Sequence, residues 1–485
     1  MKPRYSLFLL FMMLVACIPA TAEPSALPTE ITQTIKTPAS PVTVASTNAD
    51  VLSDCPLTSQ DETGGTLRLI YVIEGNLWLA DEGKEPVQMI DNGDVEQVML
   101  SPDGSRVVVT RRRDANTVEV WVADSLGWRE LSGEEGISGS VEFISLSDDG
   151  QLVAFYRLIN PDRELWVANV NAGVRQLVSR EDLRAREGGA FAFSAYPYLV
   201  TWIPGTHQLT YVPVLEGQGG DFVPNPEPVL RMDADSGEQN VLFPVDQGGY
   251  ITYSPDGKIM IITDNSRVRI LRVNNLNEPQ IIMSYTSICG IPDCYIPEPA
   301  WRPDSSSFLL TLPSEGMNPD NFLNGFEEPF MIWEFSADGA IVRTLSEFFR
   351  IARPFSFSPD LKRAAYYRRE NTLNLHIANV DGSEDILYDS DQDWDFYGWA
   401  SDSRHFAYKA HQDAPIMYGD ICGDATLLTD LANVEFVGWL GTTRFLMHVG
   451  TSTGWNLHLG TAGGNSSRLV EFGASVIYDY VLMPK

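Results

Sequence analysis

One pattern returns along the chain at intervals of roughly 40–55 residues. Each copy has a short apolar strand, a turn resembling Ser-Pro-Asp-Gly, a second apolar strand, an aromatic-bearing third strand and a fourth strand after a polar turn. Pro presets the first turn angle, Asp hydrogen-bonds its own backbone, and Gly takes positive φ. Residues that alternate with period two suit strands whose two faces differ. Four strands in such a unit predict the blade of a β-propeller.

The turn is recognisable in five copies and degenerate in three. The five copies contain Pro102, Asp103 and Gly104; Asp149 and Gly150; Pro255, Asp256 and Gly257; Pro303 and Asp304; and Pro359 and Asp360. The degenerate copies start at Ile203, Ser401 and Leu440. No helical periodicity of ten or more residues is sustained after the first residues of the chain. The sequence therefore predicts an all-β fold.

The two ends of the repeat region predict how the ring closes. The first unit supplies only three strands, Leu67–Val72, Asn76–Ala80 and Pro86–Ile90, and Ala474–Met483 is a strand without a unit. Pairing these N- and C-terminal strands in one blade would leave no exposed edge. Eight turns and this shared blade count to nine, whereas propellers more often have up to eight blades. We expect a single β-propeller of eight to nine four-stranded blades.

The repeat resembles the TolB-like propeller repeat, also described as WD40-like or PD40. The resemblance covers residues 67–485 and rests on turns such as Ser101-Pro102-Asp103-Gly104 followed by third strands such as Glu164-Leu165-Trp166-Val167. It implies protein partners at the cell envelope, and it transfers no specific contact residue to this chain. Some propellers of this kind are lyases or hydrolase accessories, so the fold does not exclude an enzyme.

The N-terminus predicts export. Residues 1–16 carry a basic start and a nine-residue apolar run, Leu7–Val15, which is too short to span a bilayer and is typical of a signal peptide. Leu14-Val15-Ala16-Cys17 resembles the lipobox of bacterial lipoproteins, in which the Cys becomes the first mature residue and carries lipid. An ordinary leader cut after Ala20-Thr21-Ala22 is the alternative.

A linker and a propeller are expected after the leader. Residues 17–63 comprise the lipidated Cys17 and a stretch rich in Pro, Thr, Ser and Ala, which has too few large apolar residues to fold. Residues 64–485 form the propeller. We expect an extracytoplasmic monomer whose lipid alone anchors it to a bacterial membrane, at the cell surface or in the periplasm. The net charge of −31 repels phosphate backbones and argues against nucleic-acid binding.

Four further cysteines predict disulfides. They are Cys55, Cys289, Cys294 and Cys422. An even number outside the cytoplasm favours bridges. Cys289 and Cys294 frame a loop whose Gly and Pro suit a tight turn, which leaves Cys55 with Cys422 by elimination. A zinc site is the alternative, although the C-x4-C spacing is unusual for zinc and no His pair lies nearby.

Binding is expected on one face of the disc. Connections between strands 1 and 2 and between strands 3 and 4 share one face, and strand 2–3 loops and interblade links share the other. The latter face receives the inserts at about 215–228 and 313–329, the 289–294 loop, the acidic link at 389–395 and the Arg111-Arg112-Arg113 run. Loops spared from packing are where binding usually occurs, so we expect a site on this face and at the channel mouth. Tolerated surface decoration is the alternative.

One acidic run has a spacing that favours a metal ion. Asp389, Asp391, Asp393 and Asp395 alternate, so on an extended strand they would point to one side. Calcium prefers such oxygen ligands, although the EF-hand pattern is not met. Solvated carboxylates between blades are the alternative. Apart from this possible calcium ion, we expect no cofactor.

Three other patterns are weaker. The text of Gly450–Gly454 matches a nucleophile elbow, but it lies between two predicted strands and lacks the following helix. His448 and His458 flank that hairpin and could approach one another, and such a pair of strand histidines is more often a packing or surface feature than a ligand set. Four tryptophans near degenerate turns would form either the core or a stacking surface for glycans: Trp202, Trp301, Trp399 and Trp439.

The sequence therefore predicts a membrane-anchored, non-catalytic module that binds an envelope protein or an extracellular ligand. The alternative is an extracellular enzyme acting on glycan or peptide at the channel mouth. A structural spacer is the third hypothesis.

Overall fold

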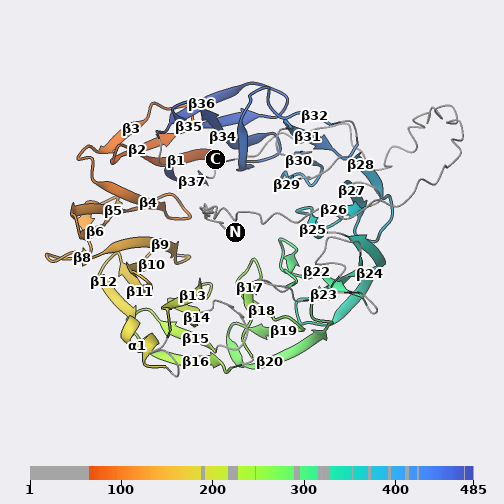
Figure 1. Ribbon diagram of the computed structural model, residues 1–485, viewed down its shortest axis with the longest axis horizontal. Coiled ribbons are helices and arrows are strands. Elements are labelled where there is room, and N and C mark those ends of the chain that lie inside the picture. Colours follow the sequence, from red (N-terminus) through yellow and green to blue (C-terminus); the bar gives the residue numbers. More distant parts are fainter. Residues whose placement is uncertain are drawn as a thin grey trace, which may run out of the picture. The chain divides into compact units, whose positions relative to one another are not determined.

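The repeat folds into sheets of four antiparallel strands, and these sheets form the blades of a β-propeller (Figure 1). The computed structural model describes residues 65–186, 192–216, 228–245, 247–288, 295–314, 318, 320, 328–351, 353–369, 373–390, 395–409, 414–422, 425–473 and 476–483. The predicted leader and linker, residues 1–63, lie outside this part of the chain and stay predictions. Within the described part, no helix has the length and apolar character needed to cross a membrane.

Nine sheets follow one another along the described chain, and each runs from an inner strand to a strand at the rim of the ring (Figure 1). From the inside outward, blade 1 consists of β37 (Ile477–Met483), β1 (Thr66–Ile73), β2 (Asn76–Asp81) and β3 (Val87–Ile90); blade 2 of β4 (Val95–Leu100), β5 (Val107–Asp114), β6 (Thr117–Asp124) and β7 (Gly127–Glu130); and blade 3 of β9 (Ser140–Leu146), β10 (Leu152–Ile159), β11 (Asp162–Asn169) and β12 (Gly173–Val178). Blade 4 consists of β13 (Ser194–Trp202), β14 (Gln208–Glu216), β15 (Val229–Asp233) and β16 (Gln239–Phe243); blade 5 of β17 (Tyr250–Tyr253), β18 (Ile259–Thr263), β19 (Arg267–Arg272) and β20 (Asn275–Ser284); and blade 6 of β21 (Ala300–Trp301), β22 (Ser307–Pro313), β23 (Glu328–Ser336) and β24 (Ile341–Ile351). Blade 7 consists of β25 (Arg353–Phe357), β26 (Arg363–Arg369), β27 (Leu373–Asn379) and β28 (Ile386–Ser390); blade 8 of β29 (Asp395–Trp399), β30 (His405–Lys409), β31 (Ile416–Asp420) and β32 (Thr426–Leu427); and blade 9 of β33 (Val434–Trp439), β34 (Arg444–Thr451), β35 (Gly454–Thr461) and β36 (Ser466–Glu471).

Blade 1 contains strands from both ends of the repeat region, as predicted. β1 pairs antiparallel with β37 from Thr66 opposite Met483 to Val72 opposite Ile477. Across the junction with blade 9, the guanidinium of Arg444 donates to the Glu82 carboxylate at 2.6 Å. The predicted β-propeller with a shared closing blade is therefore confirmed, and nine blades is the upper of the two expected counts.

In four of the turns a Ser and an Asp hold the chain reversal together, which explains their spacing. In blade 3, Ser147 Oγ donates to Asp149 Oδ1 at 2.7 Å and accepts from the backbone N–H of Leu152 at 3.0 Å. The backbone N–H of Gln151 donates to the same carboxylate oxygen at 3.0 Å. The pairs that repeat this arrangement are Ser101 with Asp103, Ser254 with Asp256, and Ser358 with Asp360.

The fourth turn position keeps a left-handed backbone even where glycine is absent. The φ angles are 66° at Gly104, 64° at Gly150, 69° at Gly257, 60° at Ser305, 57° at Leu361 and 61° at Ser403. The turn that contains Ser403 begins at Ala400, one residue before the predicted Ser401. A side chain in this region costs about 1 kcal/mol relative to Gly. Two serines offset this cost by a bond to the preceding blade. Ser305 Oγ accepts from the N–H of Asp256 at 3.0 Å, and Ser403 Oγ accepts from the N–H of Asp360 at 2.9 Å.

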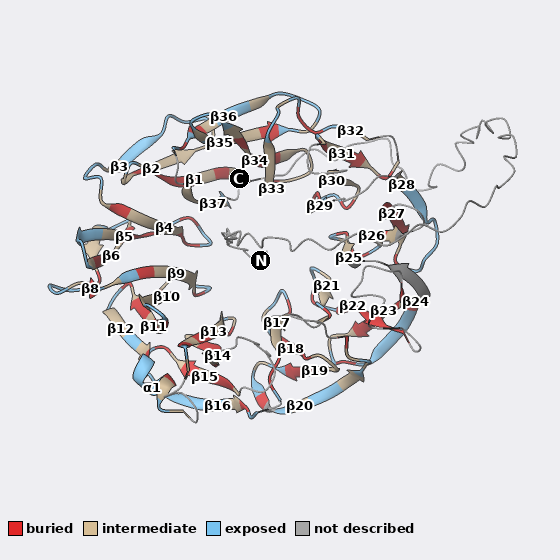
Figure 2. Ribbon diagram, viewed as in Figure 1, coloured by how far each residue is buried: buried red, intermediate tan, exposed pale blue. Residues whose placement is uncertain are grey.

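The hydrophobic core lies between blades. One cluster of buried side chains joins Leu165 of blade 3 to Leu230 of blade 4, and another joins Ala407 of blade 8 to Met447 of blade 9. Second and third strands are the most buried, whereas rim strands such as β3 are largely exposed (Figure 2). Because both faces of a blade are apolar, each blade needs two neighbours to remove its side chains from water.

Tryptophans before the degenerate turns connect neighbouring inner strands. In three cases the indole N–H donates to a backbone carbonyl of the preceding blade: Trp202 to Ser145 (3.3 Å), Trp399 to Ser356 (3.0 Å) and Trp439 to Gly398 (3.0 Å). Each of these tryptophans is only 7% exposed, which supports the core interpretation over a glycan-stacking surface. Trp301 occupies the same position, but its buried indole N–H has no partner in the described part.

Two short elements were not anticipated. The helix α1 (Arg180–Arg184) is capped by Ser179, whose hydroxyl accepts from the N–H of Asp182 while the Asp182 carboxylate accepts from the N–H of Ser179. This Ser-x-x-Asp capping box was the available signal. The strand β8 (Ile137–Ser138) adds a fifth member to blade 2 by pairing with β6.

We predict that Trp399→Phe destabilises the propeller by about 2–4 kcal/mol, because it removes ring volume and leaves the Ser356 carbonyl without its donor. Trp301→Phe is the matched control. Both tryptophans pack on a phenylalanine of the second strand. The ring centroids are 5.1 Å apart for Trp399 and Phe406 and 4.6 Å apart for Trp301 and Phe308. The indole N–H of Trp301, however, donates no hydrogen bond within the described residues. Urea unfolding followed by far-ultraviolet circular dichroism should show a loss at least 1 kcal/mol smaller for Trp301→Phe. Equal losses would mean that the hydrogen bond contributes nothing.

Candidate functional site

The antiparallel order within each blade distributes the connections over two faces. Turns between strands 1 and 2, such as 101–106, lie on the same face as turns between strands 3 and 4, such as 125–126. We call this the turn face. Loops between strands 2 and 3, such as 115–116, lie on the opposite face together with the links between blades. We call this the insert face.

The irregular segments identified in the sequence join strands at their insert-face ends. The inserts follow β14 and β22, which are second strands. The segments 289–294 and 391–394 connect blades, and Arg111-Arg112-Arg113 lies at the insert-face end of β5. Residues 217–227, 289–294 and 391–394, together with most of 315–327, lie outside the described residues. The strands on either side of them confirm the predicted sorting of connections between faces.

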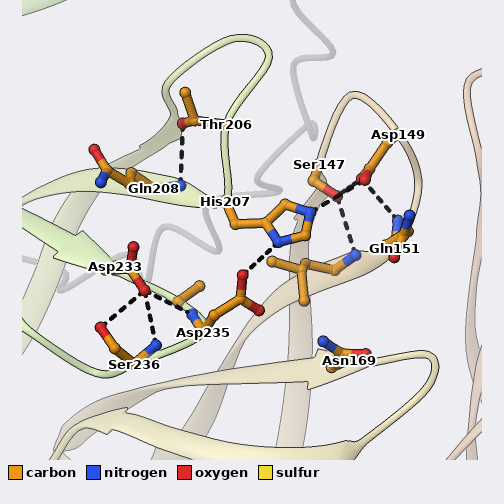
Figure 3. A network of polar contacts seen from close by, with 12 residues as sticks. Ser147, Asp149, Gln151, Asn169, Thr206, His207, Gln208, Asp233, Asp235 and Ser236 are labelled. Atoms are coloured by element: carbon orange, nitrogen blue, oxygen red, sulfur yellow. Dashed lines mark hydrogen bonds and ion pairs between the residues drawn. The ribbon is translucent and has the colours of Figure 1, made fainter.

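Polar groups on the turn face bind one another across blades. His207 of blade 4 contacts Asp235 through Nδ1 at 2.6 Å and Asp149 of blade 3 through Nε2 at 3.1 Å (Figure 3). These two carboxylates raise the pKa of His207. The backbone N–H of Gly205 also donates to Asp148 at 2.8 Å. The contacts fasten the turns of blades 3 and 4 together.

A second histidine network lies on the turn face of blade 8. His405 Nδ1 contacts Asp402 Oδ2 at 2.6 Å, and its ring stacks on Tyr418 with centroids 4.8 Å apart. Arg404 donates to both oxygens of Asp420, which also lies 3.5 Å from His405 Nε2. Burial opposes a charge on His405, but the hydrogen bonds to Asp402 and Asp420 outweigh it and raise its pKa to about 9.

A groove of about 1030 Å³ opens on the insert face at the ring closure. We call it the closure groove. Its lining comes from three consecutive blades. Blade 9 contributes Thr453 and Glu471–Gly473, and blade 1 contributes Ile477 and Val72–Gly75. Blade 2 and the link that leads into it contribute Gly93–Glu96 and Arg112–Ala115. All of these residues lie in strand 2–3 loops, in interblade links or at adjoining strand ends. The closure groove therefore spans the blade that joins the two ends of the repeat region.

The closure groove is acidic. Its lining contains five carboxylates and two guanidinium groups, a formal charge of −3 (2 − 5). The two arginines are engaged locally, because Arg112 binds Glu96 and Arg113 Nε lies 3.4 Å from Glu119. From the adjoining β5, Arg111 pairs with Asp94 at 2.7 Å. The negative charge of the remaining carboxylates is therefore left facing the groove.

Glu74 stands out among these carboxylates. Glu74 and Gly75 form the two-residue turn between β1 and β2, with φ angles of 50° and 74°. Such a turn favours Asn-Gly, so Glu at its first position is unfavourable. The side chain is exposed, and the structure gives its carboxylate no hydrogen bond or ion pair within the described residues. Asp114 accepts a bond from the backbone N–H of Asn116 at 2.8 Å but forms no ion pair with a described cation.

The proposed calcium ligands are only partly within the described chain. Asp389 accepts from the hydroxyl of Tyr408 at 3.3 Å, and the exposed Asp395 begins β29. Asp391 and Asp393 lie outside the described residues. Among the residues that are described, no group of three or more His, Cys, Asp or Glu side chains is placed to hold a metal ion. The calcium site stays a prediction.

Among the five cysteines, the structure describes only the position of Cys422. Cys422 lies in the strand 3–4 turn after β31, where its N–H donates to Asp420 Oδ1 at 2.9 Å. This position is on the turn face. Cys17, Cys55, Cys289 and Cys294 lie outside the described residues. Lipidation and both predicted bridges therefore stay predictions.

The hairpin of β34 and β35 gives a clear result for two of the weaker patterns. Thr451 pairs with Gly454, so the Gly450–Gly454 stretch is a tight turn between strands rather than a nucleophile elbow. His458 lies opposite Met447, and His448 lies opposite Leu457. Adjacent register positions alternate between sheet faces, so the two histidines point to opposite sides. The expected approach of His448 and His458 was wrong.

The comparisons with known proteins add the fold alone. No protein-family model matches the sequence, and no curated protein matches it. A crystal structure of a eukaryotic initiation factor matches with a TM-score of 0.54 and 10% identity over 88% of this chain and 100% of that chain. TolB from Acinetobacter baumannii matches with a TM-score of 0.25 and 15% identity over 57% of this chain and 62% of that chain. Dipeptidyl peptidase 4 from Porphyromonas gingivalis matches with a TM-score of 0.42 and 12% identity over 84% of this chain and 60% of that chain. The last two likenesses carry no argument about this chain.

We predict that His405 contributes pH-dependent stability. Its folded pKa of about 9 exceeds its ordinary value of 6.5, so the contribution is complete below pH 6.5 and is lost as the pH rises through 9. The difference in unfolding free energy between the native protein and His405→Gln should shrink by about 1–2 kcal/mol between pH 6 and pH 10, allowing for solvent screening.

His458→Gln is the control for this measurement. Burial, followed by the charge of Arg468, lowers the pKa of His458, so its contribution does not change above pH 7. A difference for His405→Gln that stays constant from pH 6 to pH 10 would show that folding does not raise the pKa of His405.

Proposed function

We propose that this protein is a lipid-anchored, extracytoplasmic β-propeller that binds a protein of the cell envelope through its insert face and performs no catalysis. The observation that carries the proposal is the unequal character of the two faces. On the turn face, serine, aspartate and histidine side chains satisfy one another within and between blades. The insert face combines the longest connections with the closure groove.

The envelope location is supported by the sequence. The leader 1–16, Cys17 and the linker up to residue 63 together form the arrangement of an exported protein held near a membrane by lipid. The TolB-like repeat is the second support, because that resemblance implies protein partners at the envelope. A linker rich in Pro and Thr then acts as a spacer between the membrane and the propeller.

Binding is favoured over catalysis by where the histidines lie. His207 and His405 belong to strand 1–2 turns, and their aspartate partners belong to strand 1–2 or strand 3–4 turns, so all of them lie on the turn face. His207 joins neighbouring turns and His405 fastens one blade, so each has a structural role. In the closure groove the described carboxylates are accompanied by no histidine, serine or cysteine. A binding surface accounts for this lining without a reaction.

We predict that blocking the insert face abolishes capture of a partner. Residues 50–485, immobilised and exposed to native envelope extract, should retain a protein that an unrelated acidic propeller does not retain. A 5-kDa polyethylene glycol attached at Ser452→Cys, in the insert-face turn of blade 9, should reduce capture about tenfold or more by steric exclusion. The same polymer at Ser125→Cys, in the turn-face turn between β6 and β7, should leave capture unchanged. The reverse pattern would place binding on the turn face.

We also predict that Cys17 carries lipid. Cells fed an alkyne-labelled fatty acid should incorporate the label into the native chain, and detergent should be needed to extract the protein from membranes. Cys17→Ser should lose the label and release the protein in soluble form, because acyl chains supply the membrane affinity. Label retained by Cys17→Ser, or cleavage of the native chain after Ala22, would rule out the lipid anchor.

A further inference from the structure

We infer that the closure groove binds an extended peptide segment bearing Lys or Arg side chains. The inference rests on the proposed function and specifies where on the insert face the partner docks. The groove is formed by turns and links from three successive blades rather than by one loop. An extended chain can lie across such a row of connections. The volume of about 1030 Å³ lies at the upper end of the range for small-molecule pockets.

The charge of the closure groove selects a cationic occupant. Within the described residues, Glu74 forms no ion pair, Asp114 is near only the charge of Arg113 and forms no ion pair with it, and Glu471 pairs with the exposed Arg468 at 2.7 Å. An exposed pair of this kind contributes little, so a ligand cation can replace it. The chain as a whole carries −31, which attracts cationic partners over a distance.

The floor of the groove suits the stems of long cationic side chains. Val72 and Phe472 are buried at 5% and 2% exposure, and Ile73 and Ile477 are half-buried beside them. Lys and Arg place their methylene groups on apolar surface while their charged ends reach polar groups. The carboxylates of the rim then meet the ammonium or guanidinium groups. An anionic or wholly apolar segment would leave the carboxylates of the closure groove without compensation.

The arrangement is less suited to a metal ion. The three carboxylates Glu74, Asp114 and Glu471 come from different connections on different blades. No described trio of His, Cys, Asp or Glu side chains is close enough to bind one ion. Separated carboxylates match successive cationic residues along a chain.

The test measures binding of a fluorescein-labelled decapeptide of alternating Lys and Ser to residues 50–485 by fluorescence anisotropy. We expect saturable binding that weakens as salt rises. The variant Glu74→Gln/Asp114→Asn/Glu471→Gln should bind at least about tenfold more weakly. The control Glu85→Gln/Glu238→Gln/Glu278→Gln removes the same charge from exposed positions on the turn face and the rim, and should change the Kd by less than about twofold.

A single substitution separates binding from folding. Glu74→Asn places a residue that tolerates positive φ in the turn before Gly75, so thermal unfolding should occur at a higher temperature while peptide binding weakens. Weaker binding by a more stable protein is not a folding defect. If neither Glu74→Asn nor the triple variant of the groove weakened peptide binding, the assignment of the site would be overturned.

The remaining outcomes are also decisive. Equal weakening by the groove and control triples would attribute binding to net charge and overturn the proposed site. If spermidine displaced the peptide at the same concentration of positive charge, the ligand class would be a polyamine, and the peptide inference would fail. If no peptide binds while the polymer at Ser452→Cys still abolishes capture, the closure-groove inference fails and the proposed function stands. If the polymer at Ser125→Cys abolishes capture instead, the proposed function fails independently of the peptide result.

Discussion

Packing between blades is the constraint on which this molecule depends. Each sheet is apolar on both faces, and the core consists of clusters shared by two neighbouring blades, such as the one around Leu165 and Leu230. A blade at the end of an open array would expose one of these faces to water, and closing the ring removes both such ends. Closure requires a strand from the far end of the chain. The pairing of β1 with β37 supplies it, and thereby couples the stability of blades 1 and 9 to both termini of the repeat.

The same geometry makes the two faces chemically different. Short turns at the strand 1–2 positions bring the Ser and Asp of one blade close to those of the next, and Ser305 and Ser403 accept bonds from the preceding turn despite their left-handed backbones. His207 adds a further link between blades 3 and 4. The hydrogen-bonding groups of these residues are therefore used to hold the turns and blades together. The opposite face also has polar contacts between blades, such as those of Asp162 with Arg184 and with the backbone N–H of Ala195. Several of its connections are nevertheless longer than the turns, and loops of this kind tolerate added length and charge without disturbing the ring.

The sequence predicted those features that depend on contacts between nearby residues or on a repeating pattern. The Ser-x-Asp spacing predicted the turns because both side chains bond within five residues of the chain, as Ser147 and Asp149 do. Strand alternation and the missing fourth strand of the first unit predicted the closing blade. The faces of the connections followed from counting antiparallel strands.

The candidate site was not predictable in the same way. Val72 and Phe472 meet in one groove although 400 residues separate them, and no local pattern contains that proximity. The histidine pair was misplaced because textual nearness of His448 and His458 ignored the one-residue offset that puts them on opposite faces of a hairpin. Of the groove residues, only Glu74 and Gly75 have a recognisable local pattern in the sequence. They form a two-residue connection between strands whose first residue is unfavourable in such a turn.

A groove at the closure couples ligand binding to the integrity of the ring. Its lining includes the link from blade 9 and the start of β37, so a ligand that contacts both Glu471 and Glu74 holds the closing strand beside β1. Opening the ring between blades 9 and 1 would separate those two residues, and the ligand would lose one set of contacts. Binding to the closed form alone stabilises it by about 2.7 kcal/mol when the ligand is present at one hundred times its Kd. The acidic residues repel one another in the empty groove, and a cationic segment reverses that effect. Charge repulsion across the closure therefore opposes ring stability only while no cation is bound, which gives a physical reason for a cation-binding site to lie where the ring is joined.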